Sequence, residues 1–176
     1  MNLALAGTHA SGKTTLAEHL GRSLPGWSIV DEPYYLLESE GHQFFDPPSA
    51  EDFELQLAHS ITSIEGATGN CIFDRSPLDF LAYLLTDPSS AGVDFDRWIP
   101  QVQQALCRLD RIIYLPLEAP DRMRDIAIEH PRLRRRMDEK LRELLEEDPW
   151  RFGMTVIEVR GSVEERARQV LAGLET

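Results

Sequence analysis

Lysine is scarce in this sequence: Lys13 and Lys140 are the only two in a chain of 176 residues. Acidic residues outnumber lysine and arginine by 30 to 18, so the formal net charge at pH 7 is −12. A surface of this charge repels nucleic-acid polymers and anionic membranes at long range, and we expect neither as a partner. Any anion that the protein binds must therefore be held locally, by backbone amides and a few basic side chains.

Cysteine and long apolar runs are scarce as well. Cys71 and Cys107 lie in apolar surroundings without the spacing of a zinc site or a disulfide framework, and we expect both thiols to be buried. No stretch reaches the ~20 apolar residues that span a bilayer, and the N-terminal apolar run is too short for a signal peptide. We therefore expect a cytoplasmic protein. The composition and length are typical of one globular domain over residues 1–176.

Short apolar runs alternate with longer segments of helical periodicity, which is typical of a parallel sheet covered by helices. The expected strands are residues 2–6, 28–31, 70–74, 111–115 and 154–159. The expected helices are residues 13–23, a short one from about 34 that ends at 41, then 50–66, 77–85, 95–109, 121–128, 132–148 and a last one after 162. Ser49 with Asp52, and Ser162 with Glu165, have the spacing of capping boxes at two helix starts. This order predicts one three-layer α/β domain.

Residues 7–14 carry the motif with the clearest chemistry. They read Gly-Thr-His-Ala-Ser-Gly-Lys-Thr and match GxxxxGK[ST] in full, between an expected strand and an expected helix. The glycines allow successive amides to turn inward above the positive end of the helix, which suits a polyphosphate. Lys13 can reach the β- and γ-phosphates, and the Thr14 hydroxyl is placed to bind Mg²⁺. We predict an ATP and Mg²⁺ site with contacts from Gly7, His9, Ala10, Ser11, Gly12, Lys13, Thr14 and Thr15.

Charged residues follow two other expected strands. Asp31 and Glu32 follow the second strand, where a carboxylate faces the crevice in which open α/β sheets bind ligands. Such a carboxylate can accept a proton from an attacking hydroxyl, or it can merely solvate the end of the strand. Asp74 ends the third strand in the Walker B pattern, which places a carboxylate on the metal side. Arg75 next to it either binds phosphate or pairs with a carboxylate.

These residues together resemble a known family. The phosphate loop, Glu32-Pro33, Asp74-Arg75-Ser76 and the strand IIYL before Pro120-Asp121 resemble deoxyribonucleoside and nucleoside monophosphate kinases of the phosphate-loop (P-loop) class. GTHASGKTTLA with DRSPLDFLAYLL is similar to small bacterial ATP-binding proteins akin to the nicotinamide riboside kinase domain. The resemblance implies a P-loop NTPase fold with a five-stranded parallel sheet in the order 2-3-1-4-5. It also implies transfer of the ATP γ-phosphoryl group to a small nucleoside, nucleotide or ribosyl acceptor.

The resemblance also implies roles for individual residues. Glu32 would be the base or the carboxylate that binds the acceptor, Asp74 a metal ligand, and Arg75 a phosphate contact. Such kinases carry an arginine-bearing lid, which we place at about 128–138, with Arg132 as the arginine expected to reach the phosphates. The alternative is that the arginines solvate an exposed helix face, where Arg134 with Asp138 and Arg135 with Glu139 form i,i+4 pairs.

Several further residues keep two interpretations. Phe44 and Phe45, in the irregular loop 41–49, can stack on a base or anchor that loop to the core, and the same holds for Tyr34, Tyr35 and Trp98. Arg122 and Arg124 are candidates for stacking on adenine.

Helices 51–66 and 94–107 could offer an apolar face to a second copy in a homodimer. The alternative function is a nucleotide-dependent regulatory ATPase without a small-molecule acceptor.

Overall fold

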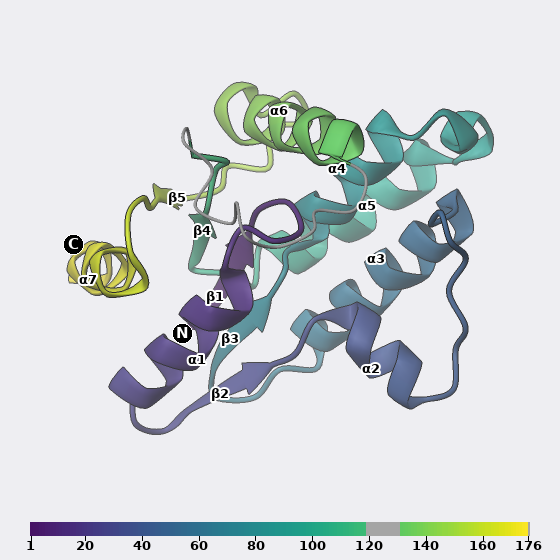
Figure 1. Cartoon of the computed structure of the whole chain (residues 1–176). Helices are drawn as coiled ribbons and strands as arrows, with labels where there is room; N and C mark the ends of the chain where they lie inside the picture. The colour runs from purple at the N-terminus through teal and green to yellow at the C-terminus, as the bar shows by residue number, and fades with distance from the viewer. Residues whose placement is uncertain (119–130, 176) are drawn as a thin grey trace.

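A five-stranded parallel sheet forms the centre of the molecule, as seen in a computed structural model that describes residues 1–118 and 131–175. Its order is β2-β3-β1-β4-β5, which confirms the expected order. Figure 1 shows the sheet between two layers of helices. The strands are β1 (Asn2–Ala6), β2 (Trp27–Val30), β3 (Asn70–Asp74), β4 (Arg111–Tyr114) and β5 (Val156–Glu158).

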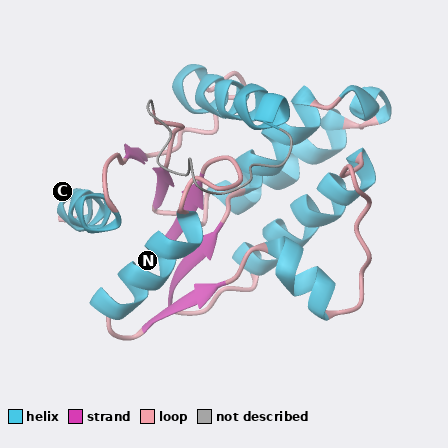
Figure 2. Cartoon of the chain, in the orientation of Figure 1, coloured by secondary structure: helices cyan, strands magenta, loops and turns pink. Residues whose placement is uncertain are grey.

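Helices cover both faces of this sheet (Figure 2). One face is covered by α1 (Lys13–Ser23) and α7 (Val163–Leu174), which pack against each other. The other face is covered by α3 (Ala50–Glu65), α4 (Pro77–Thr86), α5 (Phe95–Leu106) and α6 (Pro131–Glu147). The short helix α2 (Pro33–Ser39) packs against α3, and a 3₁₀ helix, η1 (Pro88–Gly92), connects α4 to α5.

The two faces of β1 explain the two-sided core. Successive side chains of a strand point to opposite faces, so a strand covered on both sides reads as a continuous apolar run. Leu3 and Leu5 point into the core under α1 and α7, whereas Ala4 and Ala6 point into the larger core under α3 to α6. All four are fully buried. The sequence NLALA therefore places β1 at the centre of the sheet.

Most of the expected elements are present, with small differences at their ends. Both capping boxes form at the starts of α3 and α7. The helix expected over 95–109 ends at Leu106, and η1 lies between the helices expected over 77–85 and 95–109. The helix expected over 121–128 lies outside the described residues. Cys71 is buried as expected, but the expectation for Cys107 was wrong: it is exposed, because it caps α5 beyond the buried residues of that helix.

The apolar faces of α3 and α5 are used inside the chain. Phe53, Leu57 and Ile61 of α3, with Trp98 and Val102 of α5, belong to the core under the sheet. These residues therefore offer no free surface to a second copy, and a homodimer stays a prediction. Among residues 1–118 and 131–175, no helix combines the length and apolarity needed to cross a membrane.

Candidate functional site

The sheet register brings three functional segments to one edge. Leu5 of β1 pairs with Asp74 of β3, and Val30 of β2 pairs with Phe73. Because these strands are parallel, the segment after β1, the carboxylates after β2 and the end of β3 leave the sheet side by side. This edge is where ligands of open α/β sheets bind.

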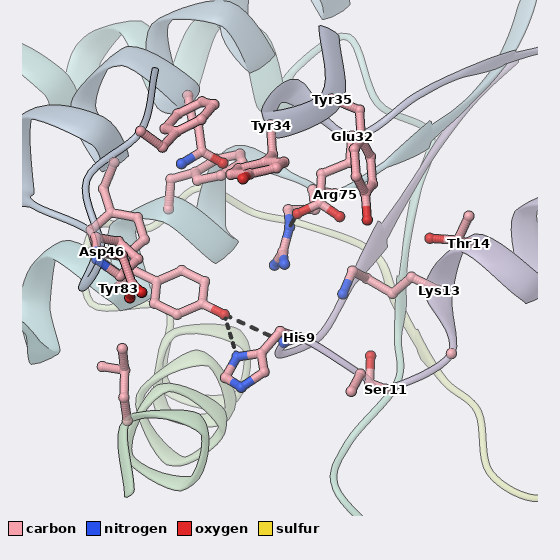
Figure 3. A pocket seen from close by; sticks show the side chains of 18 of the residues that line it. His9, Ser11, Lys13, Thr14, Glu32, Tyr34, Tyr35, Asp46, Arg75 and Tyr83 are labelled. Atoms are coloured by element: carbon pink, nitrogen blue, oxygen red, sulfur yellow. Dashed lines mark hydrogen bonds and ion pairs between the residues drawn. The ribbon is translucent and has the colours of Figure 1, made fainter. Parts of the chain in front are cut away.

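A cleft of about 700 Å³ opens at this edge (Figure 3). One wall, here called the loop wall, is formed by residues 9–15 of the phosphate loop and the start of α1. The opposite wall, here called the aromatic wall, consists of Tyr34, Tyr35, Phe44, Phe45, Phe53, Phe80 and Tyr83. Glu32 and Arg75 line the cleft as well. Of the residues predicted to bind ATP, all except Gly7 line this cleft.

Two glycines of the phosphate loop are required by its shape. A Cβ atom on Gly7 would lie 2.7 Å from the Leu115 carbonyl oxygen, too close for any side chain. Gly12 precedes α1 with a φ of 89°, in the left-handed region that glycine adopts most easily. Ala10 also has a positive φ, 53°, although it carries a side chain. The loop therefore contains one strained non-glycine residue at its tip.

Lys13 is held inside the loop rather than extended into solvent. Its side chain is only 4% exposed, and its Nζ donates to the Thr8 carbonyl oxygen at 2.9 Å. Burial, followed by the nearby charge of Arg75, lowers the pKa of Lys13 to about 8, against the opposing pull of Glu32, Asp79 and Asp74. An anionic ligand in the loop would offset both effects and favour the charged amine.

Asp74 and Thr14 meet at the base of the loop. The Thr14 hydroxyl donates to Asp74 Oδ2 at 2.6 Å. The other carboxylate oxygen, Oδ1, is buried and has no partner. Burial raises the pKa of Asp74 above its ordinary value, although Lys13 and the Thr14 hydrogen bond act in the opposite direction. A buried carboxylate with one unpaired oxygen beside a hydroxyl suits a hydrated divalent cation.

Glu32 and Arg75 form an ion pair at the floor of the cleft. Arg75 Nε donates to Glu32 Oε1, and its Nη1 donates to the Gly7 carbonyl oxygen at 3.3 Å. Burial raises the pKa of Glu32, but the charges of Arg75 and Lys13 outweigh burial and hold that pKa below its ordinary value. Glu32 is therefore ionised at neutral pH. Asp31, by contrast, is exposed, so only Glu32 of this pair belongs to the cleft.

In this structure Arg75 pairs with carboxylates, which is one of the two roles expected for it; the other was to bind phosphate. Its guanidinium also lies 5.9 Å from the ring centroid of Phe80 and 5.6 Å from that of Tyr83. Its backbone has a φ of 105°, which a non-glycine residue rarely adopts. Such strain persists only where the surrounding contacts hold the residue in place.

Asp79 is a site residue that sequence reasoning missed. It is fully buried and accepts hydrogen bonds from the Gly7 amide at 2.9 Å and from the Ser76 amide and hydroxyl. Its Oδ1 also lies 3.5 Å from Arg75 Nη1. Asp79 therefore ties the start of the phosphate loop to the start of α4. The spacing of Ser76 and Asp79 is that of a capping box and could have drawn attention to it.

The aromatic wall depends on the loop over residues 41–49. The Phe44 ring stacks on Tyr34 with centroids 4.4 Å apart, and Tyr35 and Phe45 are 57% and 63% exposed. Asp52, at the start of α3, holds the loop by accepting from the amides of Phe45 and Ser49. Trp98 does not line the cleft. It belongs to the core, where its Nε1 donates to Glu54.

A second, smaller pocket of about 160 Å³ lies behind the phosphate loop. Arg166 of α7 lines it and donates through Nη1 to the Ser11 carbonyl oxygen at 2.7 Å and through Nη2 to Glu118 at 2.8 Å. Its Nε is buried without a partner. Sequence reasoning missed Arg166, because no local pattern connects a residue of the last helix to a loop 155 residues earlier.

The first residues of the expected lid, 128–130, lie outside the described residues, as do Arg122 and Arg124. Residues 131–138 form the start of α6. Arg132, the arginine expected to reach the phosphates, is exposed there. Arg134 instead is buried and donates to the carbonyl oxygens of His9 and Ala10, each at 2.9 Å. Contact of Arg132 with the phosphates stays a prediction. The alternative of an exposed Arg134 with Asp138 was wrong, because both side chains face the protein interior.

The fold and this edge of the sheet define a P-loop protein. Residues 2–166 match a family model described as an AAA domain, and the chain belongs to that family. No curated protein sequence matches the chain significantly.

Several solved structures with the same fold are named as kinases or contain a bound nucleotide. Deoxyadenosine kinase from M. mycoides with bound dATP is similar with a TM-score of 0.67 and 17% identity, over 100% of both chains. The NadR protein in complex with NAD and AMP-PNP gives a TM-score of 0.68 and 17% identity, over 99% of this chain and 49% of that one. Thymidylate kinase from Candida albicans gives 0.63 and 14%, over 99% and 90%. At such identities the likeness establishes the fold.

Proposed function

We propose that this protein is an ATP-dependent kinase that transfers the γ-phosphoryl group to a hydroxyl of a small acceptor with a flat ring, such as a nucleoside or another ribosyl compound. One observation carries the proposal: an ionised carboxylate, Glu32, lies in the same cleft as a complete phosphate loop. The nucleotide and the acceptor would then approach each other from the two walls of one cavity.

The loop wall suits Mg·ATP. Backbone amides of residues 9–14 and the Lys13 amine would bind the polyphosphate, and the second pocket, beside Arg166, would receive the base. Thr14 and the unpaired oxygen of Asp74 would hold Mg²⁺ and its waters. When bound, Mg²⁺ neutralises charge on the phosphates. Residues 1–118 and 131–175 hold no cluster of three or more metal-binding side chains, which fits an ion bound mainly through the nucleotide.

The charge of the cleft favours an uncharged hydroxyl over a phosphate as the acceptor. A phosphate monoester is already deprotonated at its attacking oxygen, so it needs no base, and it would be repelled by Glu32. Among the described residues that line the cleft, the basic ones are His9, Lys13 and Arg75. Lys13 belongs to the loop wall, and Arg75 already binds Glu32. The described part of the cleft therefore offers an acceptor phosphate little compensation.

The aromatic wall supplies the other half of acceptor recognition. Stacked and exposed rings, with the buried amide side chain of Gln56 beside them, suit a flat ring that carries hydrogen-bonding groups. Stacking of a base on an aromatic side chain contributes ~1–3 kcal/mol in other systems.

Chemistry in this arrangement consists of positioning and charge stabilisation. The acceptor oxygen attacks the γ-phosphorus while its proton passes to Glu32, and the bond between the γ-phosphorus and the oxygen of the leaving ADP breaks. Lys13 balances the negative charge that develops around the transferred group, and Arg75 holds Glu32 in position beside the acceptor.

A lysine pair within the chain provides a matched test. The Lys13→Ala variant should lose phosphoryl transfer while remaining folded. Lys140→Ala should retain it, because the half-buried Lys140 pairs with Glu143 on α6 and does not line the cleft. Purified protein with Mg·ATP would be screened against nucleosides, their own 5′-monophosphates and ribosyl compounds, with ADP and phosphorylated product both measured. Product from nucleosides or ribosyl compounds supports the proposal. Unchanged turnover in Lys13→Ala would refute it.

The same screen separates the alternative function. A nucleotide-dependent regulatory ATPase would form ADP at one rate whichever acceptor is present, and no phosphorylated acceptor would accumulate. If only monophosphates gave a phosphorylated product, the protein would still be a kinase, but the proposal of a hydroxyl acceptor would be wrong.

A further inference from the structure

The tip of the phosphate loop is held from two sides by residues outside the motif. From α4, the Tyr83 hydroxyl accepts the His9 amide at 3.3 Å and lies 3.1 Å from His9 Nδ1 (Figure 3). From α6, the Arg134 guanidinium donates to the carbonyl oxygens of His9 and Ala10. Both peptide groups that flank His9 are thus bound by side chains of distant elements.

Both contacts are rigid. Tyr83 is buried, and its ring stacks on Phe53 with centroids 4.7 Å apart and planes 5° from parallel. Arg134 is 4% exposed, and α6 packs along α4. Side chains locked by packing hold their partners more accurately than side chains on mobile loops do.

The segment that these contacts hold, residues 9–10, also contains a strained backbone conformation. Ala10 has a φ of 53°, in the left-handed region that costs a residue with a Cβ atom ~1 kcal/mol or more. A glycine at this position would adopt the same conformation without that cost. The loop therefore relies on outside contacts to keep a conformation that its own sequence does not favour.

We propose that Tyr83 and Arg134 are positioning residues that hold residues 9–10 of the phosphate loop in the conformation that binds ATP. The inference rests on the proposed function only in taking ATP as the ligand of the loop. It has an unexpected consequence, because Tyr83 belongs to the aromatic wall: removing its hydroxyl should weaken binding of the nucleotide on the opposite wall.

ATP affinity measured by calorimetry, without any acceptor, tests this directly. Tyr83→Phe keeps the stacked ring and should raise the Kd for Mg·ATP about 3- to 10-fold, and Arg134→Gln, which removes a charged donor, about 10- to 100-fold. Matched controls are Tyr114→Phe, which removes a buried hydroxyl bound to Asp138, and Arg22→Gln, which removes an exposed arginine of α1. Both controls should keep the wild-type Kd, although the first will lower stability.

A second variant distinguishes positioning from direct contact with ATP. Ala10→Gly relieves the strain, so adding it to Arg134→Gln should recover most of the lost affinity. A Kd within twofold of wild type in both Tyr83→Phe and Arg134→Gln, or no recovery with Ala10→Gly, would overturn the proposal. If the wild type binds ATP but transfers no phosphoryl group, the proposed kinase function is wrong, yet the Kd values of the variants still test this inference. If the wild type does not bind ATP, both fail.

Discussion

The two walls of the cleft are built in opposite ways. The loop wall comes from seven consecutive residues, 9–15, in the phosphate loop and the start of α1. The aromatic wall collects side chains from α2, the loop 41–49, α3 and α4. The loop wall presents backbone amides and one lysine, and the aromatic wall presents rings. The Glu32 carboxylate lies in the same cleft. Recognition of a phosphate chain can therefore be encoded locally, while the shape of an acceptor pocket requires several distant segments.

The largest expected effect is a loss of catalytic rate that leaves the affinity for ATP unchanged. Glu32→Gln keeps the shape of the side chain but removes the base, so kcat should fall ~10²- to 10⁴-fold while the Kd for ATP changes little. Because the pKa of Glu32 is lowered, the wild-type rate should not fall with acid until below about pH 4.5, near the ordinary value of a glutamate. The matched control is Asp31→Asn, at the exposed residue next to Glu32. Equal loss in both variants would contradict the assignment of Glu32.

A large effect on stability is expected at Asp79, which ties the phosphate loop to the start of α4. Asp79→Ala leaves the Gly7 and Ser76 amides without their buried acceptor and removes one of the two carboxylates beside Arg75, and loss of one member of such a group costs ~3–5 kcal/mol. Urea unfolding monitored by circular dichroism would measure the change. Asp87→Ala, which removes a half-buried side chain that, among the described residues, accepts only from the Ser89 amide, should cost far less. A loss below ~1 kcal/mol for Asp79→Ala would show that the loop does not depend on it.

A smaller, pH-dependent effect is expected at the base of the aromatic wall. Burial raises the pKa of Asp52, but hydrogen bonds from Ser49, Phe45 and His42 outweigh burial and lower it. Its stabilising contribution is therefore complete above the unfolded pKa of about 3.8 and is lost as the pH falls through the lower folded value. Asp52→Asn should lower the free energy of unfolding by ~2 kcal/mol at pH 7.

Acid should remove that difference. Near pH 2 the wild type and Asp52→Asn should unfold at closer urea concentrations than at pH 7. A gap that widens in acid would mean that Asp52 is not the group responsible.

The smallest effect is expected for His42→Ala. His42 Nε2 lies 3.4 Å from Asp52 Oδ1 and the ring packs edge-on against Phe44, yet the side chain is one-third exposed. Removing it should cost less than ~1 kcal/mol of stability. It should raise the KM for the acceptor only a few-fold and leave the Kd for ATP unchanged. A larger change in ATP affinity than in acceptor KM would break the separation between the two walls.

Local patterns were sufficient for the elements and for the loop wall. The run NLALA, the motif over residues 7–14 and the capping box at Ser49 each act through near neighbours: a pleated strand, a turn of inward amides and a helix start. For this reason the bounds of β1, α1 and α3, and the residues of the loop wall, could be read from the chain. The sheet order came from the family resemblance, because periodicity alone does not fix which strands pair.

Only the tertiary structure decided which distant side chains complete the site. It placed Arg134 against the phosphate loop and left Arg132 exposed, because the packing of α6 on α4 determines which arginine faces that loop. It brought Arg166 to Ser11, attached Asp79 to Gly7, and turned Arg75 toward Glu32. The sequence alone determined the phosphate-loop motif that connects β1 to α1; long-range packing, which no short motif encodes, determined what holds that loop and what faces it.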